Sequence, residues 1–416
     1  MSRHAPPAPR SPRNGQRRPA PVPAGLAARI SAVSIIDSVL THSRTLDEAM
    51  ETAFADPPLE PRDRAFARAI ASTVLRRLGE LEAVLGSFVD KPPRTQGQAW
   101  PILLSGAAQL LFLETPPHAA ISLAVDQVRA DRRTPHLAGL VNAVLRKVAT
   151  EGAARLAALD GPAVNVPGWL RERWSAAYGA DAARAIAVAS LREAALDLSV
   201  KGDAAQWAEL LGGIVVPTGS VRVAARGPVE DLAGYGEGAW WVQDAAAALP
   251  ARLLGPVGGL SVADLCAAPG GKTAELAASG ARVTAVEASS ARIGRLSANL
   301  ARLRLEADVV LADAAAYNPG RTFDAVLLDA PCTATGTIRR HPDILRLKRP
   351  DDAARLAVDQ ARLLDAAARL VRPGGQLIYC TCSLEREEGP DQIARFLAVA
   401  HGFRRRPLES RDVGGC

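Results

Sequence analysis

Three side chains near the ends of two apolar runs could carry out nucleophilic chemistry. Asp329 ends the run Phe323–Asp329 and is followed closely by Cys332, while Cys382 ends the run Gly375–Cys382. A thiolate is the strongest nucleophile that a side chain offers near neutral pH. Two cysteines at the rim of one crevice, one of them beside a carboxylate, therefore predict covalent catalysis.

The other thiols in this part of the chain are interpreted differently. Cys266 and Cys380 lie within or beside apolar runs, which is the usual setting of inert, buried cysteines. Cys380 and Cys382 would point to the same face, but no histidine or fourth cysteine is suitably spaced, so we expect no metal site. Five cysteines are a poor disulfide framework for 416 residues, and we expect reduced thiols.

Short apolar runs separated by helical patterns or polar loops must position these groups. This alternation predicts a parallel α/β sheet, in which ligands bind beyond the carboxyl ends of the strands. Each run ends in a residue that is able to do chemistry. The expected strands are Leu260–Leu265, Ala281–Glu287, Ala307–Asp313, Phe323–Asp329 and Gly375–Cys382, and the residues expected at one crevice are Glu287, Asp313, Asp329, Cys332 and Cys382.

A glycine-rich turn follows the first of these runs. Its residues Cys266, Ala267, Ala268, Pro269, Gly270, Gly271 and Lys272 lead into a helix over 273–278. Glycines allow a ligand to approach the backbone, and the N–H groups that open a helix suit a polar or anionic group. Glu287 could accept the two hydroxyls of a ribose and Asp313 an adenine amine. A plain strand-to-helix connection and ordinary surface acids are the alternatives.

The positive charge of the chain is concentrated at its beginning. Residues 1–25 hold five arginines, seven prolines and no acid, so they account for five of the six formal positive charges. This composition predicts a disordered tail that attracts nucleic acid or simply aids solubility. No apolar stretch approaches a membrane span and no secretory signal core is present, so we expect a cytoplasmic protein without membrane partners, acting as a monomer.

The rest of the chain divides into three parts. Apolar stripes at helical spacing, such as Phe66, Ile70 and Val74, predict an all-helical domain over 26–150. Residues 151–238 predict a small α/β connector, with a helix over 169–191, strands over 196–200 and 221–224, and a helix over 205–211 between them. Residues 239–416 contain the crevice and begin with a helix over 245–254 that Asp244 can cap.

Segments of the helical part resemble the NusB-type antitermination factors, whose domain binds RNA. The resemblance concerns mostly core positions, so it supports the fold more than the function. A domain that serves only as a scaffold is the alternative. The matching segments are 61–64, 106–112, 117–121 and 137–146.

The motifs at 266–273, 327–344 and 380–383 resemble the RNA cytosine-5 methyltransferases of the NOL1/NOP2/Sun family. With the helical front domain, the match is closest to its bacterial ribosomal RNA members. The resemblance implies a Rossmann-like domain that uses S-adenosylmethionine to methylate small-subunit ribosomal RNA. It implies that Cys382 attacks the cytosine, that Cys332 assists product release, and that Asp329 orients the base and lies near the cofactor.

A basic loop beyond Cys332 could hold RNA phosphates, although a merely solvated loop is the alternative. Its residues are Arg339, Arg340, His341, Arg346, Lys348 and Arg349.

Two segments depart from the family pattern. Residues 191–201 lack the Asn-rich, Pro-Pro-containing stretch of relatives, and after a strand expected over 402–408 the chain ends without the sheet's last strand. We therefore expect an incomplete sheet edge.

Two other functions are considered. Two segments, Gly271-Lys-Thr273 and 325–329, resemble parts of the motifs of a P-loop NTPase. Cys266, however, occupies the position of the first glycine of the phosphate-binding motif. A non-catalytic RNA-binding assembly factor is the second alternative.

Overall fold

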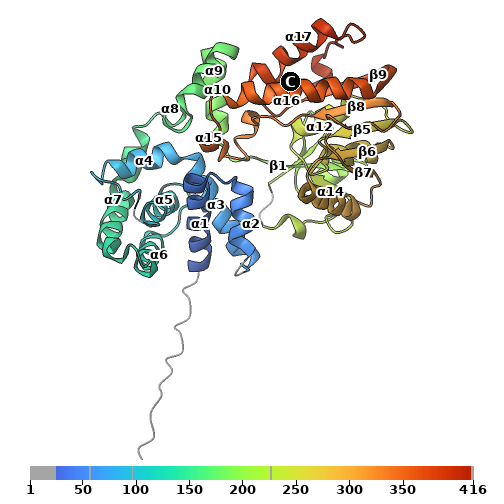
Figure 1. Ribbon diagram of the computed structural model, residues 1–416. Coiled ribbons are helices and arrows are strands. Elements are labelled where there is room, and N and C mark those ends of the chain that lie inside the picture. Colours follow the sequence, from blue (N-terminus) through green and yellow to red (C-terminus); the bar gives the residue numbers. More distant parts are fainter. Residues whose placement is uncertain (1–24, 56–57, 96, 225–226, 414–416) are drawn as a thin grey trace, which may run out of the picture.

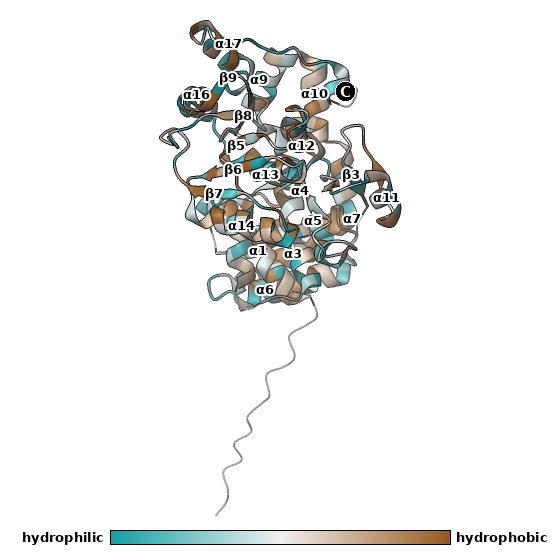
Figure 2. Ribbon diagram, turned by 90° about the vertical axis from the view of Figure 1, so that its right-hand side faces the viewer, coloured by the Kyte–Doolittle hydropathy of each residue, from teal (hydrophilic) through white to brown (hydrophobic). Residues whose placement is uncertain are grey.

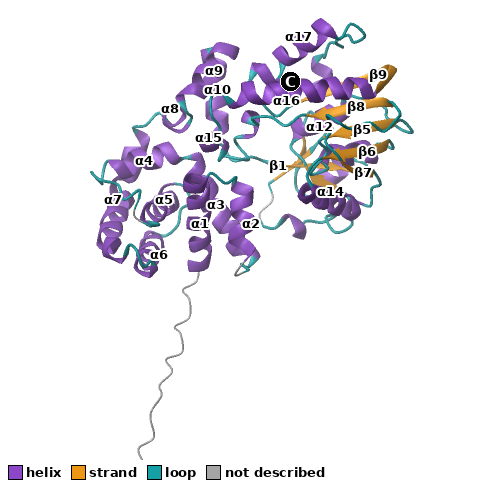
Figure 3. Ribbon diagram, in the orientation of Figure 1, coloured by secondary structure: helices purple, strands orange, loops and turns teal. Residues whose placement is uncertain are grey.

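The computed structural model describes residues 25–55, 58–95, 97–224 and 227–413, arranged as a helical part beside a part built on strands (Figure 1). Apart from Gly25, the basic tail expected over residues 1–25 lies outside the described residues. Figure 3 shows the purple helical part at the left and the orange strands stacked at the right.

The helical part is the all-α domain that the apolar stripes predict. Ile70, Leu75 and Leu103 are fully buried at its centre, where residues of several helices form one continuous apolar core. Prolines open two of the helices at Pro61 and Pro117, in the first turn, where no N–H donor is needed. The helices are α1 (Leu26–His42), α2 (Leu46–Ala55), α3 (Pro61–Arg76), α4 (Leu78–Gly86), α5 (Ala99–Leu111), α6 (Pro117–Ala130), η1 (Pro135–Leu137) and α7 (Ala138–Ala157).

Three further helices, α8 (Gly161–Asn165), α9 (Gly168–Tyr178) and α10 (Ala180–Ser190), begin the connector. The segment predicted to be helical over 169–191 is helical, but Gly179, with φ 85° and ψ 162°, divides it into α9 and α10. Glycine adopts this left-handed backbone readily, whereas an L side chain would be strained there. The break turns α10 back against α9.

A small antiparallel sheet completes the connector. Its strand order is β2-β3-β1-β4, and Leu198 of β1 lies opposite Val242 of β4. The boundary expected at residue 238 therefore divides a sheet, because β4 belongs with the strands before it. Trp240 decides this placement, since its fully buried ring packs with Leu198 and Val221. The elements are β1 (Leu196–Val200), α11 (Ala204–Leu210), β2 (Ile214–Val215), β3 (Val221–Val223), η2 (Val229–Asp231) and β4 (Trp240–Val242).

The large sheet is parallel, with strand order β7-β6-β5-β8-β9 in the described residues. Its strands carry both hydrophobic and hydrophilic residues, coloured brown and teal (Figure 2). The elements of this part are α12 (Ala245–Arg252), β5 (Ser261–Leu265), α13 (Gly271–Ala278), β6 (Arg282–Glu287), α14 (Ser290–Leu303), β7 (Asp308–Leu311), β8 (Phe323–Asp329), η3 (Thr335–Thr337), α15 (Ile344–Leu347), α16 (Asp352–Leu370), β9 (Val371–Cys380), η4 (Arg386–Glu388), α17 (Pro390–Val399) and η5 (Ser410–Val413).

Alternate residues of the central strands enter different cores. Leu265 and Leu328 pack with Leu364 of α16, whereas Val262 and Leu327 contact a separate cluster that includes residues of α12 and α13. Both faces of the sheet are therefore covered by helices, which is the doubly wound arrangement expected of a Rossmann-like domain. The predicted fold class, a helical bundle joined through a small α/β connector to this domain, is confirmed.

The strand predicted over 402–408 is wrong. Residues 404–409 form an exposed loop, and β9 is the last strand of the large sheet among the described residues. Three consecutive arginines and Pro407 leave this segment without an alternating apolar face. Phe403 instead packs on Phe396 of α17, with ring centroids 5.4 Å apart.

Candidate active site

The loops after β5, β8 and β9 meet at one edge of the large sheet. Leu265 lies beside Leu328 in the sheet, and Asp329 lies beside Cys380, so these strands end at nearly the same level. Asp329, Cys332 and Cys382 come together there, as the sequence predicts. Glu287 ends β6 at the same edge, and Asp313 follows β7 as an exposed residue whose carboxylate accepts the Ala315 N–H at 2.9 Å.

The two predicted catalytic thiols are in direct contact. The sulfur atoms of Cys332 and Cys382 lie 3.4 Å apart, with Cys382 exposed and Cys332 half-buried. A hydrogen bond from the Cys332 thiol lowers the pKa of Cys382 below its usual value. The same bond, together with burial, raises the pKa of Cys332. The pair therefore contains one thiol that ionises more readily, Cys382, and one that stays neutral and donates a hydrogen bond, Cys332.

Cys380 and Cys266 have a different environment. The Cys380 sulfur lies 3.5 Å from an Asp329 carboxylate oxygen, and burial raises its pKa well above the usual value. Burial also raises the pKa of Cys266, to about 12. Both thiols therefore stay neutral and unreactive. Cys266 follows β5 with φ 63°, so it begins the glycine-rich turn rather than lying within the sheet.

Lys272 and Asp329 form an ion pair beside the thiols. The Lys272 amine donates to an Asp329 carboxylate oxygen at 2.7 Å. Burial alone would lower the pKa of Lys272, but the charge of Asp329 raises it above its usual value. The last residue of the glycine-rich turn thus reaches the catalytic carboxylate, a contact that the sequence motifs did not reveal.

The glycine-rich turn is held in one conformation by helix α14. Gly270 caps α13 with φ 103°, and a Cβ atom there would lie 2.5 Å from a methyl carbon of Leu296. Asn299 donates to the Pro269 carbonyl at 2.9 Å, and Arg292 donates to the Ala268 carbonyl at 2.5 Å. The turn is therefore preorganised, and glycine is required at its tightest point.

The basic loop after Cys332 packs against parts of the chain that precede the large sheet. Arg346 is half-buried and donates to the Asn165 carbonyl at 2.9 Å, and burial lowers its pKa to about 10. Its guanidinium therefore points into the protein, where its Nε has no hydrogen-bond partner among the described residues, and this argues against the predicted RNA contact. Arg340 pairs with Asp244 at 3.2 Å. Arg339 and Lys348 are half-buried, as is His341, and Arg349 is exposed.

The same loop contacts the helical domain, which sequence reasoning missed. Asp343 accepts the Leu46 N–H of α2 at 3.0 Å, and Arg76 of α3 donates to the Arg339 carbonyl at 2.9 Å. His341 lies 3.9 Å from Asp47. The domain that resembles an RNA-binding module is thereby attached to the segment that follows Cys332.

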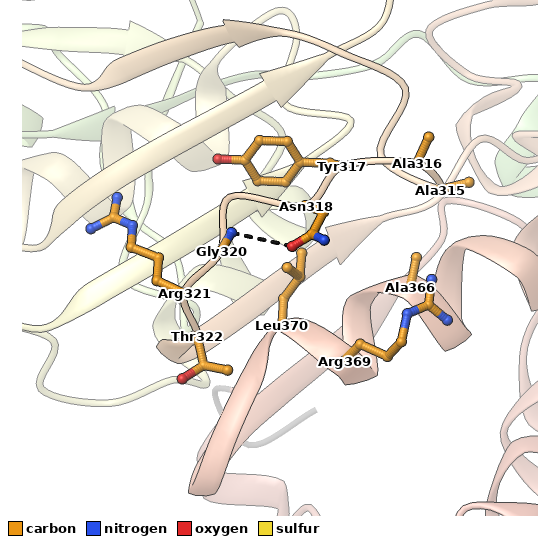
Figure 4. Close-up of a pocket in the computed structure, with 10 residues that line it drawn as sticks. All are labelled: Ala315, Ala316, Tyr317, Asn318, Gly320, Arg321, Thr322, Ala366, Arg369 and Leu370. Atoms are coloured by element: carbon orange, nitrogen blue, oxygen red, sulfur yellow. Dashed lines mark hydrogen bonds between the residues drawn. The ribbon is translucent and has the colours of Figure 1, made fainter.

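A pocket of about 620 Å³ lies elsewhere, between residues 315–322 and the end of α16 (Figure 4). Tyr317, Arg321 and Arg369 are among its lining residues. It adjoins the amino end of β8, whereas Asp329 ends that strand. This pocket is therefore separate from the catalytic edge.

Two family models match the chain. Residues 251–414 match the model described as 16S rRNA methyltransferase RsmB/F, and residues 26–150 match the NusB family. The ribosomal RNA small subunit methyltransferase B of Xanthomonas campestris pv. campestris is 39% identical over 403 residues, covering 92% of this chain and 91% of the relative. The chain belongs to the RsmB/F methyltransferase family.

Other relatives agree with this assignment. The protein of the same name from Xylella fastidiosa (strain Temecula1) is 41% identical over 391 residues, covering 90% of this chain and 89% of the relative. The solved structure of PH0851 has a TM-score of 0.71 at 24% identity and covers 94% of this chain and 93% of its own, which shows a shared fold.

RsmB/F membership makes the chain an S-adenosylmethionine-dependent methyltransferase. It overturns the P-loop alternative, and the site gives the physical reason. Lys272 pairs with Asp329, and the Thr273 hydroxyl donates to Asp264 at 2.6 Å, so neither side chain is free for a phosphate or its metal ion.

The residues at the turn fit this cofactor. Asp264 is fully buried, and one of its carboxylate oxygens has no hydrogen-bond partner in the described structure, which suits a ligand that carries an amino group. Burial raises the pKa of Asp264 to about 7. Sequence reasoning passed over this residue, although an acid inside the apolar run 260–265 was a visible signal.

Glu287 is already held in place. Its buried carboxylate accepts the N–H groups of Ser289 at 2.9 Å and Ala268 at 3.3 Å, and it pairs with Arg292 at 3.4 Å. These bonds orient it at the end of β6, beside the turn.

The described residues offer neither a metal site nor a membrane span. No group of three or more His, Cys, Asp or Glu side chains there could hold a metal ion. No helix in the described ranges is long and apolar enough to cross a membrane.

Proposed function

We propose that the protein transfers a methyl group from S-adenosylmethionine to carbon 5 of a cytosine in small-subunit ribosomal RNA, through a covalent bond to Cys382. The contact between the Cys382 and Cys332 sulfurs, beside the Lys272–Asp329 pair, is the observation that carries this proposal. The family and the names of the relatives support the RNA substrate.

Cys382 begins the reaction. Carbon 5 of cytosine is a weak nucleophile, and addition of the Cys382 thiolate to carbon 6 places electron density on it. Asp329 accepts a hydrogen bond from the amino edge of the ring, and Lys272 holds that carboxylate in place and supplies positive charge close by. The bound cofactor supplies an electrophilic methyl group to carbon 5.

Cys332 acts at the end of the reaction. After a base removes the proton from carbon 5, the bond between carbon 6 and the Cys382 sulfur breaks and the electron pair of that bond returns to sulfur. The neutral Cys332 thiol, 3.4 Å away, donates a hydrogen bond to the departing thiolate and stabilises it. This assigns product release to Cys332.

The turn formed by residues 266–272 would hold the cofactor at one side of these groups. Glu287 would bind its ribose, Asp313 its adenine, and Asp329 would lie towards the reacting centre. The exposed position of Asp313 and the preorganised turn support these roles.

The RNA crosses the helical domain and the loop after Cys332. Residues 26–150 and the side chains of Arg339, Arg340, His341, Lys348 and Arg349 contribute contacts to it, whereas residues 151–242 connect the two parts. We propose that the protein acts as a monomer. A ribosomal RNA substrate places the protein in the cytoplasm.

The test uses labelled S-adenosylmethionine, unmodified small-subunit ribosomal RNA and, as a control substrate, large-subunit RNA. The native protein should form 5-methylcytosine in the small-subunit RNA alone, and Cys382→Ala should form none. Label in another nucleoside would overturn the cytosine assignment. RNA binding without any transfer would favour the non-catalytic assembly factor.

A further inference from the structure

Glu388 lies fully buried behind the two thiols, and none of the steps above uses it. One of its carboxylate oxygens accepts the Thr333 N–H at 2.9 Å, and the other accepts the hydroxyls of Thr333 and Ser383. Thr333 follows Cys332 in the chain, and Ser383 follows Cys382. A single carboxylate therefore joins the two segments that carry the thiols.

Gln360 of α16 holds the same cluster from behind. Its buried amide donates to a Glu388 carboxylate oxygen and to the Pro331 carbonyl, both at 2.9 Å. Cys332 is thus held on both sides, through Pro331 by Gln360 and through Thr333 by Glu388. The Tyr379 hydroxyl of β9 donates to the Glu388 carbonyl at 2.8 Å, which fixes η4 as well.

Burying the charged Glu388 carboxylate costs free energy unless hydrogen bonds compensate for the lost solvent. A carboxylate without solvent needs several donors, and each donor pointing at it loses a partner if the carboxylate is removed. Thr333, Ser383 and Gln360 supply those donors. Glu388 is therefore an acceptor that both thiol-bearing loops share, and it adds to the bond from the Gly336 N–H to the Cys382 carbonyl at 2.9 Å.

We propose that Glu388 is the positioning residue that sets the contact between the Cys332 and Cys382 sulfurs, and thereby the turnover of the methyl transfer. The inference rests on the proposed function. Glu388 acts through Thr333 and Ser383 and touches no reacting atom. It should therefore govern the covalent steps and leave the binding of RNA and cofactor unchanged.

The first test compares Glu388→Gln with Asp391→Asn, a half-buried carboxylate three residues later that pairs with Arg386. Glutamine keeps the size of the side chain but replaces an acceptor oxygen with a donor. We expect kcat of Glu388→Gln to fall about tenfold or more, with both KM values within about twofold of native. Asp391→Asn should match native. A kcat equal to that of the control, or a change confined to KM, would overturn the proposal.

The second test measures the thiol contact without RNA. Phenylarsine oxide bridges two adjacent thiols, so the native protein should bind it in a manner that Cys332→Ala abolishes. Glu388→Gln should weaken this binding about tenfold, because the loops separate. If the native protein makes no 5-methylcytosine but Glu388→Gln still loses arsenical binding, the proposed function fails and the positioning role stands.

A milder variant keeps the proposal testable if Glu388→Gln does not fold, as judged by its melting temperature. Ser383→Ala removes a single donor, and it should lower kcat and arsenical affinity about threefold each. Native values of both quantities in Ser383→Ala, or native arsenical binding in a folded Glu388→Gln, would refute the positioning role.

Discussion

The residues proposed to bind the cofactor and those proposed to act on the cytosine base are held in place in different ways. We call these two groups the cofactor side and the base side of the catalytic edge. On the cofactor side, the turn and Glu287 are fixed by hydrogen bonds to residues 2 to 30 positions away. On the base side, Lys272 and Asp329 are 57 positions apart, Thr333 and Glu388 are 55 apart, and Arg173 of α9 reaches Glu387 across 214.

This difference predicts which step of the reaction is impaired when residues on each side are changed. A turn built by its neighbours in the chain keeps its shape once β5 and α14 pack, whereas the thiol pair needs β8, β9 and the connector in place together. Changes on the base side should therefore impair the covalent steps, and changes on the cofactor side should impair cofactor binding. The following predictions test this division.

The largest effect is expected from Cys332→Ala. Without the thiol that stabilises the departing Cys382 sulfur, the enzyme should stop after one turnover and accumulate a covalent protein–RNA adduct. The adduct is measured as a slowly migrating, RNA-labelled band in a denaturing gel. Cys332→Ala combined with Cys382→Ala should show no such band. Normal multiple turnover in the single variant would contradict the role of Cys332.

Lys272→Met should have the next largest effect. It leaves Asp329 without its 2.7 Å partner and removes the positive charge beside the ring. We expect kcat to fall about 10²-fold to 10³-fold, measured under single-turnover conditions with saturating RNA and cofactor. Lys272→Arg keeps the charge and should retain more activity than methionine. A loss confined to cofactor KM would place Lys272 on the cofactor side instead.

Glu287→Gln should act on cofactor binding alone. Replacing a carboxylate that orients a ribose weakens binding, so the KM for S-adenosylmethionine should rise about tenfold with kcat nearly unchanged. Initial rates over a range of cofactor concentrations measure both constants. A fall in kcat at saturating cofactor would break the proposed division between the two sides.

The smallest expected effect is a shift in the pH dependence of Cys382 alkylation. The hydrogen bond from Cys332 favours the Cys382 thiolate and lowers its pKa, so removing the donor should raise that pKa towards the usual value. In Cys332→Ala, half-maximal iodoacetamide reactivity of Cys382 should therefore move to higher pH. An unchanged or lower midpoint would mean that the thiols do not interact in solution.

Most of the large sheet could be predicted from the sequence. The runs at 260–265, 281–287 and 323–329 became β5, β6 and β8 because buried parallel strands are continuously apolar. The segment 402–408 failed this test, since three arginines and a proline give it no buried face. The boundary at 238 failed for another reason, because the pairing of β4 with β1 joins residues about forty positions apart.

The sequence by itself determined the family and the fold class, and it predicted the residues that do chemistry, because all of these depend on short motifs at strand ends. Only the tertiary structure showed that Lys272 pairs with Asp329, that Arg346 donates to the Asn165 carbonyl, and that Glu388 joins the two thiol loops. These contacts form between segments that are distant in the chain, and their partners are decided by which strands lie side by side. Local sequence patterns do not predict that arrangement.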